Sequence, residues 1–292
     1  MTYPSQSIIQ WTKDNAKQLL PDAVFLSLLH RKRIGRFPKL FHPTTYNEKI
    51  LLRCLRPDSR YSALTDKLTV RDYVREKIGE KYLIPIISAP SDFTQNIFDM
   101  LPNSFVMKAN HGNNFVEIVR DKSQQSFDHL QLLASQWLST NFYKNARERH
   151  YRGIQPRIYF ESLLLDEHGM IPADYKVHCF ANGSGRPVMF IFVISDRFGS
   201  NTRGDTYDAQ WNRIDLEFAP YVRSTRPAPR PNNLELLLDT AAHLSEGFDY
   251  VRVDLYSPSD RVFFGELTFT PGAGVSPMLP DRVDYEWGRL LT

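Results

Sequence analysis

The chain has 292 residues, of which 42% are hydrophobic, 13% aromatic and 24% charged. This composition is typical of a folded globular protein and excludes a largely disordered chain. The 36 basic and 33 acidic residues give a net charge of only +3, so nucleic acid is not an expected partner.

The first third of the chain has the apolar periodicity of helices. In the stretch 45–57, Thr45 and Glu48 have the spacing of a capping box, and Pro57 supplies a stop. A second amphipathic helix is predicted in "TDKLTVRDYVREKIGEKY", with Thr65 as its N-cap and Gly79 as its C-cap.

Short β-rich runs bounded by Pro, Gly, Asn or Asp begin near residue 83 and predict strands. The predicted strands are residues 82–88, 104–110, 115–121, 156–165, 174–181 and 187–195. Helical spacing of apolar residues interrupts them at 127–143 and 233–247. This mixture of hairpins and helices predicts an α+β fold rather than a doubly wound parallel sheet.

A predicted hairpin near the C-terminus carries charged residues on otherwise apolar strands. Alternation puts Arg252 and Asp254 on one face, and Glu266 and Thr268 on one face. If the turn centres near residue 260, Asp254 and Glu266 lie opposite each other, about 5 Å apart at Cβ. Two carboxylates this close repel each other unless positive charge lies between them. A magnesium ion would meet this need, and a salt bridge from Arg252 to one acid explains the pattern equally well.

Two glycine-containing turns could bring backbone close to a ligand, because glycine has no Cβ. The turn "PGAG" at 271–274 follows the hairpin, and "HGNN" at 111–114 follows the strand that ends near Lys108. Amide groups of the second turn could cover phosphates, with the lysine aimed at the same charge. A plain chain reversal explains either turn about as well.

A third group of charged residues lies on predicted strands. Glu161 interrupts an apolar strand, and Asp174 and Lys176 share one face of the next. A buried acid needs a hydrogen-bond donor, which an adenine amino group or a lysine could supply. Surface alternation could explain Asp174 and Lys176, but it explains Glu161 less well.

Taken in order, the motifs "TDKLTVRDYV", "VMKANHGNN", "YFESLLL", "DYKVHCF", "VRVDLY" and "GELTFTPGAG" resemble the ATP-grasp superfamily over roughly residues 60–275. Together with "TYNEKI" they resemble, more narrowly, the TupA-like ATP-grasp proteins of bacterial surface-polysaccharide and teichuronopeptide biosynthesis, from about residue 37. The resemblance implies an ATP-grasp domain at 61–292, with two α+β subdomains gripping ATP, after a mainly helical segment at 1–60.

The resemblance also implies roles for individual residues. The residues expected to bind ATP are Lys67, Lys108, His111, Gly112, Asn113, Asn114, Glu161, Ser162, Leu163, Asp174 and Lys176. The expected magnesium ligands are Asp254, Glu266 and Thr268, the last at a position where ATP-grasp enzymes usually have asparagine. The expected catalytic residues are Arg252, Lys108 and Lys176.

The implied activity is ATP-dependent carboxylate-amine ligation through an acyl phosphate. The expected substrates are an amine and a carboxylate such as a uronic acid of a surface polysaccharide. The expected substrate-binding residues are Arg197, Arg203, Pro271, Gly272 and Gly274. A kinase or a glycosyltransferase of the same pathway is the alternative, although no Asp-x-Asp occurs in the chain to support a metal-dependent sugar-nucleotide site.

The remaining features concern location. Cys54 and Cys179 are too few for a disulfide framework, which indicates a reducing cytoplasm. The longest apolar run is far shorter than the roughly 20 residues of a membrane span, and the first residues lack the pattern of a signal peptide. Basic tracts occur at 30–36, 147–152 and 222–231. We interpret them as solvated surface, with an anionic sugar, phosphate or lipid headgroup, and so peripheral contact with the inner membrane, as the alternative.

Overall fold

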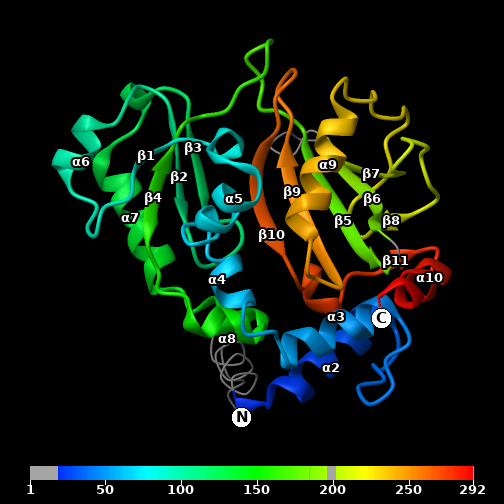
Figure 1. Ribbon diagram of the computed structural model, residues 1–292. Coiled ribbons are helices and arrows are strands. Elements are labelled where there is room, and N and C mark those ends of the chain that lie inside the picture. Colours follow the sequence, from blue (N-terminus) through cyan, green and yellow to red (C-terminus); the bar gives the residue numbers. More distant parts are fainter. Residues whose placement is uncertain (1–18, 184, 196–201, 292) are drawn as a thin grey trace.

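Two antiparallel sheets stand beside each other, and helices from both ends of the chain lie beneath them (Figure 1). The computed structural model describes residues 19–183, 185–195 and 202–291. The first sheet has the strand order β1-β4-β2-β3, and the second has the order β10-β9-β5-β6-β7. A two-stranded pair, β11-β8, accompanies them. The mixture of helices and antiparallel sheets confirms the predicted α+β class.

Each of the six predicted strand regions contains a strand. The strands are β1 (Ile86–Ser88), β2 (Phe105–Ala109), β3 (Val116–Val119), β4 (Ile158–Glu161), β5 (Asp174–Asn182), β6 (Gly185–Ser195), β7 (Arg203–Asp208), β8 (Glu217–Phe218), β9 (Tyr250–Tyr256), β10 (Phe263–Thr268) and β11 (Met278–Leu279). The helices are α2 (Asp22–Ile34), α3 (Tyr46–Leu55), α4 (Tyr61–Thr65), α5 (Val70–Ile78), α6 (Gln95–Met100), α7 (Phe127–Ser139), α8 (Phe142–Ala146), α9 (Leu234–Ser245) and α10 (Arg282–Leu290). Short 3₁₀ turns are η1 (Glu80–Tyr82), η2 (Lys122–Gln124), η3 (Arg149–Gly153) and η4 (Pro271–Gly274).

The N-terminal helices follow the predicted caps in part. At α3, the Thr45 side chain accepts from the Glu48 N–H and Glu48 accepts from the Thr45 N–H, so the capping box is confirmed. Thr65 is the last residue of α4 instead of an N-cap, because the Asp66 side chain accepts the Leu68 N–H at 2.8 Å and turns the chain before α5 begins. Gly79 ends α5 with φ of 97°, as predicted.

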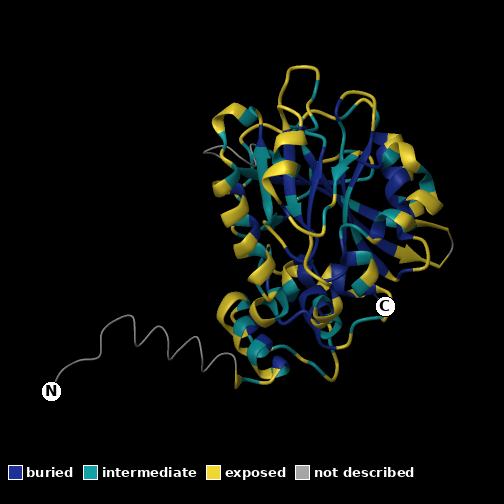
Figure 2. Cartoon of the chain, turned by 90° about the vertical axis from the view of Figure 1, so that its left-hand side faces the viewer, coloured by how far each residue is buried: buried dark blue, intermediate teal, exposed yellow. Residues whose placement is uncertain are grey.

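Each sheet has one face against helices and one face toward the other sheet. In the first sheet, Phe105, Met107 and Phe160 pack in a core with residues of α6 and α7. In the second, Val177 and Val253 pack in a core with α9. The strands themselves are mostly buried, and exposure concentrates on the helices and loops (Figure 2). Because strand side chains alternate, the residues between these core positions point toward the space between the sheets.

Several elements were not predicted, and two of them are substantial, β7 and α10. β7 contains a glycine and two aspartates, which have low strand propensity, yet it pairs with β6 from Phe190↔Asp208 to Ser195↔Arg203. Helix α10 buries Val283 and Trp287 in a cluster with α3 and the lower part of the second sheet. Among the described residues, no helix has both the length and the apolar character to cross a bilayer.

The turn η4 fits closely against α3. A Cβ built on Gly274 would lie 2.3 Å from the Asn47 carbonyl oxygen and 2.4 Å from the Leu51 nitrogen. The residue also has φ of 67°. Only glycine therefore fits at this position, where the turn η4 packs on α3.

We expect Gly274→Ala to lower the free energy of unfolding by roughly 3 kcal/mol, because the methyl group would collide with α3 backbone. Gly169→Ala is the matched control: Gly169 has φ of 72° and no atom within 4 Å of a Cβ. This control should lower the free energy of unfolding by only about 1 kcal/mol, the penalty of the backbone conformation. Equal losses in urea unfolding would contradict the close fit of η4 on α3.

Candidate active site

The hairpin β9–β10 holds two carboxylates opposite each other, as predicted. Glu266 pairs with Asp254, and Thr268 pairs with Arg252. The register shifts between Phe264 and Glu266, so one residue, Gly265, is extra on β10. All four polar side chains thereby share the face that points toward the first sheet.

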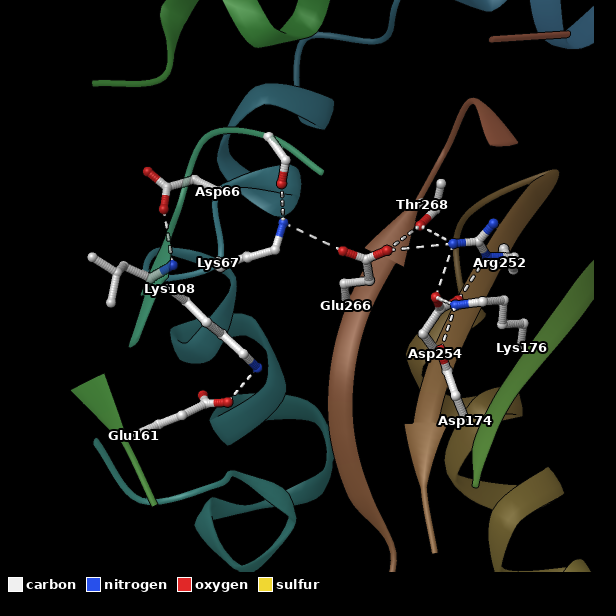
Figure 3. A network of polar contacts seen from close by, with 12 residues as sticks. Asp66, Lys67, Lys108, Glu161, Asp174, Lys176, Arg252, Asp254, Glu266 and Thr268 are labelled. Carbon is white, nitrogen blue, oxygen red and sulfur yellow. Dashed lines mark hydrogen bonds and ion pairs between the residues drawn. The ribbon is translucent and has the colours of Figure 1, made fainter. Parts of the chain in front are cut away.

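Arg252 lies between the two carboxylates (Figure 3). Its Nε is 2.6 Å from one Asp254 oxygen, and its terminal nitrogen is 2.8 Å from the other. The same nitrogen is 3.3 Å from Glu266 and 3.0 Å from the Thr268 hydroxyl. Asp254 and Glu266 together raise the pKa of the Arg252 guanidinium, although burial opposes its charge. The arginine therefore compensates both acids, whereas the salt-bridge alternative placed only one acid in contact with it.

Two lysines complete the charge balance around this pair. Lys176 of β5 lies beside Asp254 in register and contacts it at 2.5 Å, and it contacts Asp174 at 2.8 Å. Lys67, in the connection between α4 and α5, is 3.3 Å from Glu266 and donates to the Gly112 carbonyl at 2.9 Å. A lysine of the second sheet and a lysine of the α4–α5 connection thus both contact the carboxylates of the hairpin.

The opposite sheet contributes a separate ion pair beside an apolar cavity. Lys108 of β2 contacts Glu161 of β4, so the buried acid has a lysine partner, one of the two donors considered above. The cavity has about 440 Å³ of empty space, open solvent at its mouth included, and is lined from both sheets, among others by Val106, Leu163 and Tyr256. Its lining is mainly apolar, which suits an aromatic base.

Ser162 and Leu163 are the expected hinge that would contact the adenine, and the backbone N–H of Ser162 is already used within the protein. The Ser162 N–H donates to the Pro85 carbonyl at 3.0 Å. The Ser162 backbone would therefore contact a base only as an acceptor, through its carbonyl oxygen. Leu163 also lines the cavity.

The loop 111–114 joins β2 to β3 and is packed from behind by aromatic rings. A Cβ on Gly112 would lie 2.6 Å from the Phe115 ring. The His111 imidazole is buried, which lowers its pKa, and its Nε2 lies 3.0 Å from the Trp137 carbonyl of α7. His111 therefore forms part of the loop's support, while the exposed Asn113 and Asn114 form its tip.

The structure places some of the predicted substrate residues beside the hairpin and others away from it. Pro271 and Gly274 are buried in η4, which follows the hairpin, and Gly274 packs against α3. Arg203 begins β7 and shares a face with Tyr207, which packs in the core under α9. It thus lies on the opposite face from Lys176 and Asp254. Arg197 lies outside the described residues.

Glu148 is a candidate site residue that the sequence analysis missed. It belongs to the basic tract 147–152, which was interpreted as solvated surface, yet Arg147, Glu148 and His150 are buried. Thr270, directly before η4, donates to the Glu148 carboxyl. Burial raises the pKa of Glu148 to about 7, and the charge of Glu266 acts in the same direction. A buried acid inside a basic tract carries no sequence signal of its own.

The charged side chains of the site balance in formal charge. At the hairpin, three cations contact three carboxylates: Lys67, Lys176 and Arg252 contact Asp174, Asp254 and Glu266, and the separate pair of Lys108 with Glu161 lies on the opposite sheet (Figure 3). A site of this kind suits an anionic ligand whose charges replace some of the carboxylates as partners of the lysines.

Cations from both sheets thus face a carboxylate pair on the C-terminal hairpin. A family model described as TupA-like ATPgrasp matches residues 48–292. The chain therefore belongs to the TupA-like ATP-grasp family. The match begins inside α3, and the domain boundary at residue 60 stays a prediction.

Solved structures similar to this chain are ATP-grasp ligases of low sequence identity. D-alanine–D-alanine ligase from Bacillus anthracis, complexed with ATP, is 16% identical with a TM-score of 0.44, covering 78% of this chain and 64% of that one. The Helicobacter pylori enzyme of the same name is 13% identical with a TM-score of 0.43, covering 78% and 61%. The ATP-grasp ligase PsnB with a minimal precursor is 12% identical with a TM-score of 0.41, covering 73% and 55%. The chain thus spans less than two thirds of each, and no curated protein sequence matches it.

Glu148 should make stability depend on pH in a direction opposite to an ordinary acid. Its folded pKa of about 7 lies above the usual 4.5, so its contribution is fully present below about pH 4.5 and is lost as the pH rises through 7. Between pH 4 and pH 8, the free energy of unfolding of Glu148→Gln should therefore rise by about 3 kcal/mol relative to that of the parent, as measured by urea unfolding.

Glu48→Gln is the control of opposite sign. Although burial opposes its charge, backbone N–H groups of Thr44, Lys39 and Thr45 hold the pKa of Glu48 below its usual value. The free energy of unfolding of this variant should fall furthest below that of the parent at pH 8, and least at pH 4. A pH-independent difference for Glu148→Gln would show that the pKa of Glu148 is not raised in the folded protein.

Proposed function

We propose that the protein is an ATP-dependent carboxylate-amine ligase that works through an acyl phosphate. The observation that carries the proposal is the convergence of Lys67, Lys176 and Arg252 on the facing carboxylates Asp254 and Glu266. Membership of the TupA-like ATP-grasp family supports it.

The nucleotide would lie between the two sheets. The apolar cavity beside Glu161 suits the adenine, and Asp174 on the facing sheet suits the ribose hydroxyls. Lys108 and Lys67 would exchange carboxylate partners for phosphate oxygens, with the amides of the loop 111–114 covering the phosphates. Each exchange replaces one charge-assisted contact by another.

The donor set fits magnesium. Among the described residues, no group of three or more His, Cys, Asp or Glu side chains forms a candidate metal site. Two carboxylates with a hydroxyl are nevertheless suitable, since Mg²⁺ usually takes one or two carboxylates and completes its shell with water and phosphate. Asp254, Glu266 and the Thr268 hydroxyl would hold it. When bound, the ion would neutralise and orient phosphate oxygens.

The residues of this chain then act by position and charge. A substrate carboxylate oxygen attacks the γ-phosphorus and ADP leaves, which forms the acyl phosphate. The amine nitrogen then attacks the acyl carbon, loses a proton, and inorganic phosphate leaves. Arg252 faces the place where negative charge develops on the acyl oxygen, and the turn η4 forms the adjoining wall. No protein nucleophile is needed.

The substrate class follows from the resemblance of the motifs. We assign the carboxylate to a uronic acid or related acid of a bacterial surface polysaccharide, such as a capsule, and the reaction to the cytoplasm, where ATP is available. The same constellation could phosphorylate a hydroxyl group and stop there. A kinase and a ligase are separated by the product that each leaves.

A product assay decides between these reactions. The protein is incubated with MgATP and a panel of uronic acids, with and without amines, and with hydroxylamine as a trap for acyl phosphates. A ligase gives ADP together with an amide, and a hydroxamate when hydroxylamine replaces the amine. Phosphorylated sugar formed without any amine would identify a kinase and overturn the proposal.

Glu266→Gln should reduce ADP formation by at least about 100-fold, because the charge that complements the metal is lost while the size is kept. Glu246→Gln, which alters an exposed ion pair with Lys77, is the control and should keep parental activity. Circular dichroism checks that both variants are folded. Activity of the Glu266 variant at a tenth of the parental rate would rule out its metal-binding role.

A further inference from the structure

The end of α2 and the segment that leads from it to α3 carry positive charge only. Residues 23–47 contain five Lys and Arg side chains, and neither Asp nor Glu. Figure 1 shows this part of the chain at the lower edge of the molecule, beneath the sheets and beside α10. The network of the candidate active site takes no residue from it, and the proposed ligase reaction makes no use of it.

Within the part of the chain that the structure describes, only one of these five cations is paired with carboxylates. Arg36 lies 2.7 Å from both Asp281 and Asp284, which joins the segment to α10. No carboxylate of the described residues forms an ion pair with the other four cations: Arg31, Lys32, Arg33 and Lys39. All four are exposed. Positive charge therefore prevails on this surface even when both aspartates are counted.

Two phenylalanines are exposed among these cations. Phe41 is 91% exposed and Phe37 is 60% exposed. The Arg31 guanidinium lies 5.9 Å from the centroid of the Phe37 ring, so the end of α2 and the loop after it form one continuous surface. Leu40, by contrast, packs inward against the cluster that contains Leu26. Single exposed apolar residues are ordinary, but two aromatic rings among unpaired cations are typical of a surface that enters a membrane interface.

The loop that carries Phe41 is held in place from within. The Glu48 carboxylate accepts the Lys39 N–H at 3.0 Å and the Thr44 N–H at 2.8 Å, so both ends of the turn are fixed to α3. The contacts of Arg36 fix the start of the loop to α10. A loop that is already ordered loses little conformational entropy when its tip binds a partner.

Shape and charge favour a membrane over a protein as the partner. A phenylalanine at the tip of a loop needs a matching pocket on a protein, whereas the interface of a fluid bilayer accepts it without one. Lysine and arginine extend their apolar stems through the headgroup region and contact lipid phosphates. Four unpaired cations also fall within the range of about four to eight that is typical of segments that bind anionic lipids.

We propose that the exposed face of the segment 31–41 binds the surface of a bilayer that contains anionic phospholipids. This face consists of four cations and two phenylalanines: Arg31, Lys32, Arg33, Phe37, Lys39 and Phe41. The two rings enter the boundary between headgroups and acyl chains, and the cations contact lipid phosphates. Binding needs neither nucleotide nor turnover, so this proposal can fail while the ligase proposal stands.

The test is co-sedimentation of the full chain with large unilamellar vesicles at low ionic strength. One set of vesicles contains phosphatidylcholine alone, and the other contains roughly one third phosphatidylglycerol, an anionic lipid. We expect the protein to pellet with the anionic vesicles and to stay in the supernatant with phosphatidylcholine. Equal binding to both sets, or binding to neither, would overturn the proposal.

Phe41→Ser removes the ring at the tip of the loop and leaves the charges unchanged. The affinity for anionic vesicles should fall by at least about tenfold, because the ring no longer contributes apolar area to the membrane interface. Met100→Ser, which removes an exposed apolar side chain at the end of α6, is the matched control and should bind like the parent. Parental binding of Phe41→Ser would contradict insertion of the loop.

A pair of charge variants locates the surface. Lys32→Gln combined with Arg33→Gln should weaken vesicle binding by at least about tenfold, since each cation at an anionic membrane surface contributes roughly fivefold. Lys77→Gln combined with Lys81→Gln removes the same charge from exposed positions on α5 and η1 and should bind like the parent. Equal weakening in the two double variants would show that net charge, and no particular surface, explains binding.

An acidic protein segment is the competing partner for such a surface. Polyglutamate supplies its charges without a bilayer, and it is added to the vesicle-bound protein at the same concentration of negative charge as the lipid. We expect the protein to stay on the vesicles, because polyglutamate offers no apolar phase to the phenylalanines. Release of the protein by polyglutamate would assign the surface to an acidic protein and overturn the proposal.

Discussion

The extra residue at Gly265 decides where the charges of the hairpin lie. If the pairing of Phe263 with Tyr256 continued without a bulge, Glu266 would stand opposite Val253, whose side chain is in the core under α9. The bulge moves the carboxylate to the other face, opposite Asp254. A Cβ at Gly265 would lie 3.0 Å from the Asp254 carbonyl oxygen, which explains glycine at this position.

Charge compensation then makes this arrangement tolerable. Asp254 is 3% exposed, and burying an unpaired carboxylate would cost several kcal/mol. Arg252 and Lys176 offset part of that cost by contacting both of its oxygens, although burial still raises the pKa of Asp254. Because each lysine of the network already has a carboxylate partner, a triphosphate would bring negative charge to a neutral site. A divalent cation is the natural means of balancing it.

The helical layer beneath the sheets contacts the hairpin site at the turn η4. Thr270 lies between the hairpin and η4, and it is held by Glu148 from the segment that leads into β4. Gly274 fixes the same turn on α3. Three parts of the chain that are distant in sequence therefore meet at one turn, and Asp22 ties α2 to the segment that carries Glu148.

The sequence predicted local features well where one residue's chemistry determines the outcome. The Thr45–Glu48 capping box, the Gly79 cap and the register of Asp254 with Glu266 were all predicted. The register came out correctly because the observed turn centres half a residue before residue 260, and the extra residue on β10 makes up this difference.

Features that depend on tertiary contacts were predicted less well. Thr65 was wrong as an N-cap because the neighbouring Asp66 side chain competes for the backbone. Arg203 points away from the site because β7 pairs as a strand, and its composition gives no sign of this. Glu148 was missed because burial of an acid within a basic tract depends on the packing of Thr270 against it.

The most direct measurement is a crystal structure of the protein with a nonhydrolysable ATP analogue and Mn²⁺, whose anomalous scattering locates the ion. The account predicts the base in the cavity beside Glu161 and an anomalous peak between Asp254 and Glu266, with Arg252 displaced from at least one of them. A nucleotide bound elsewhere, or an ion away from these two carboxylates, would contradict it.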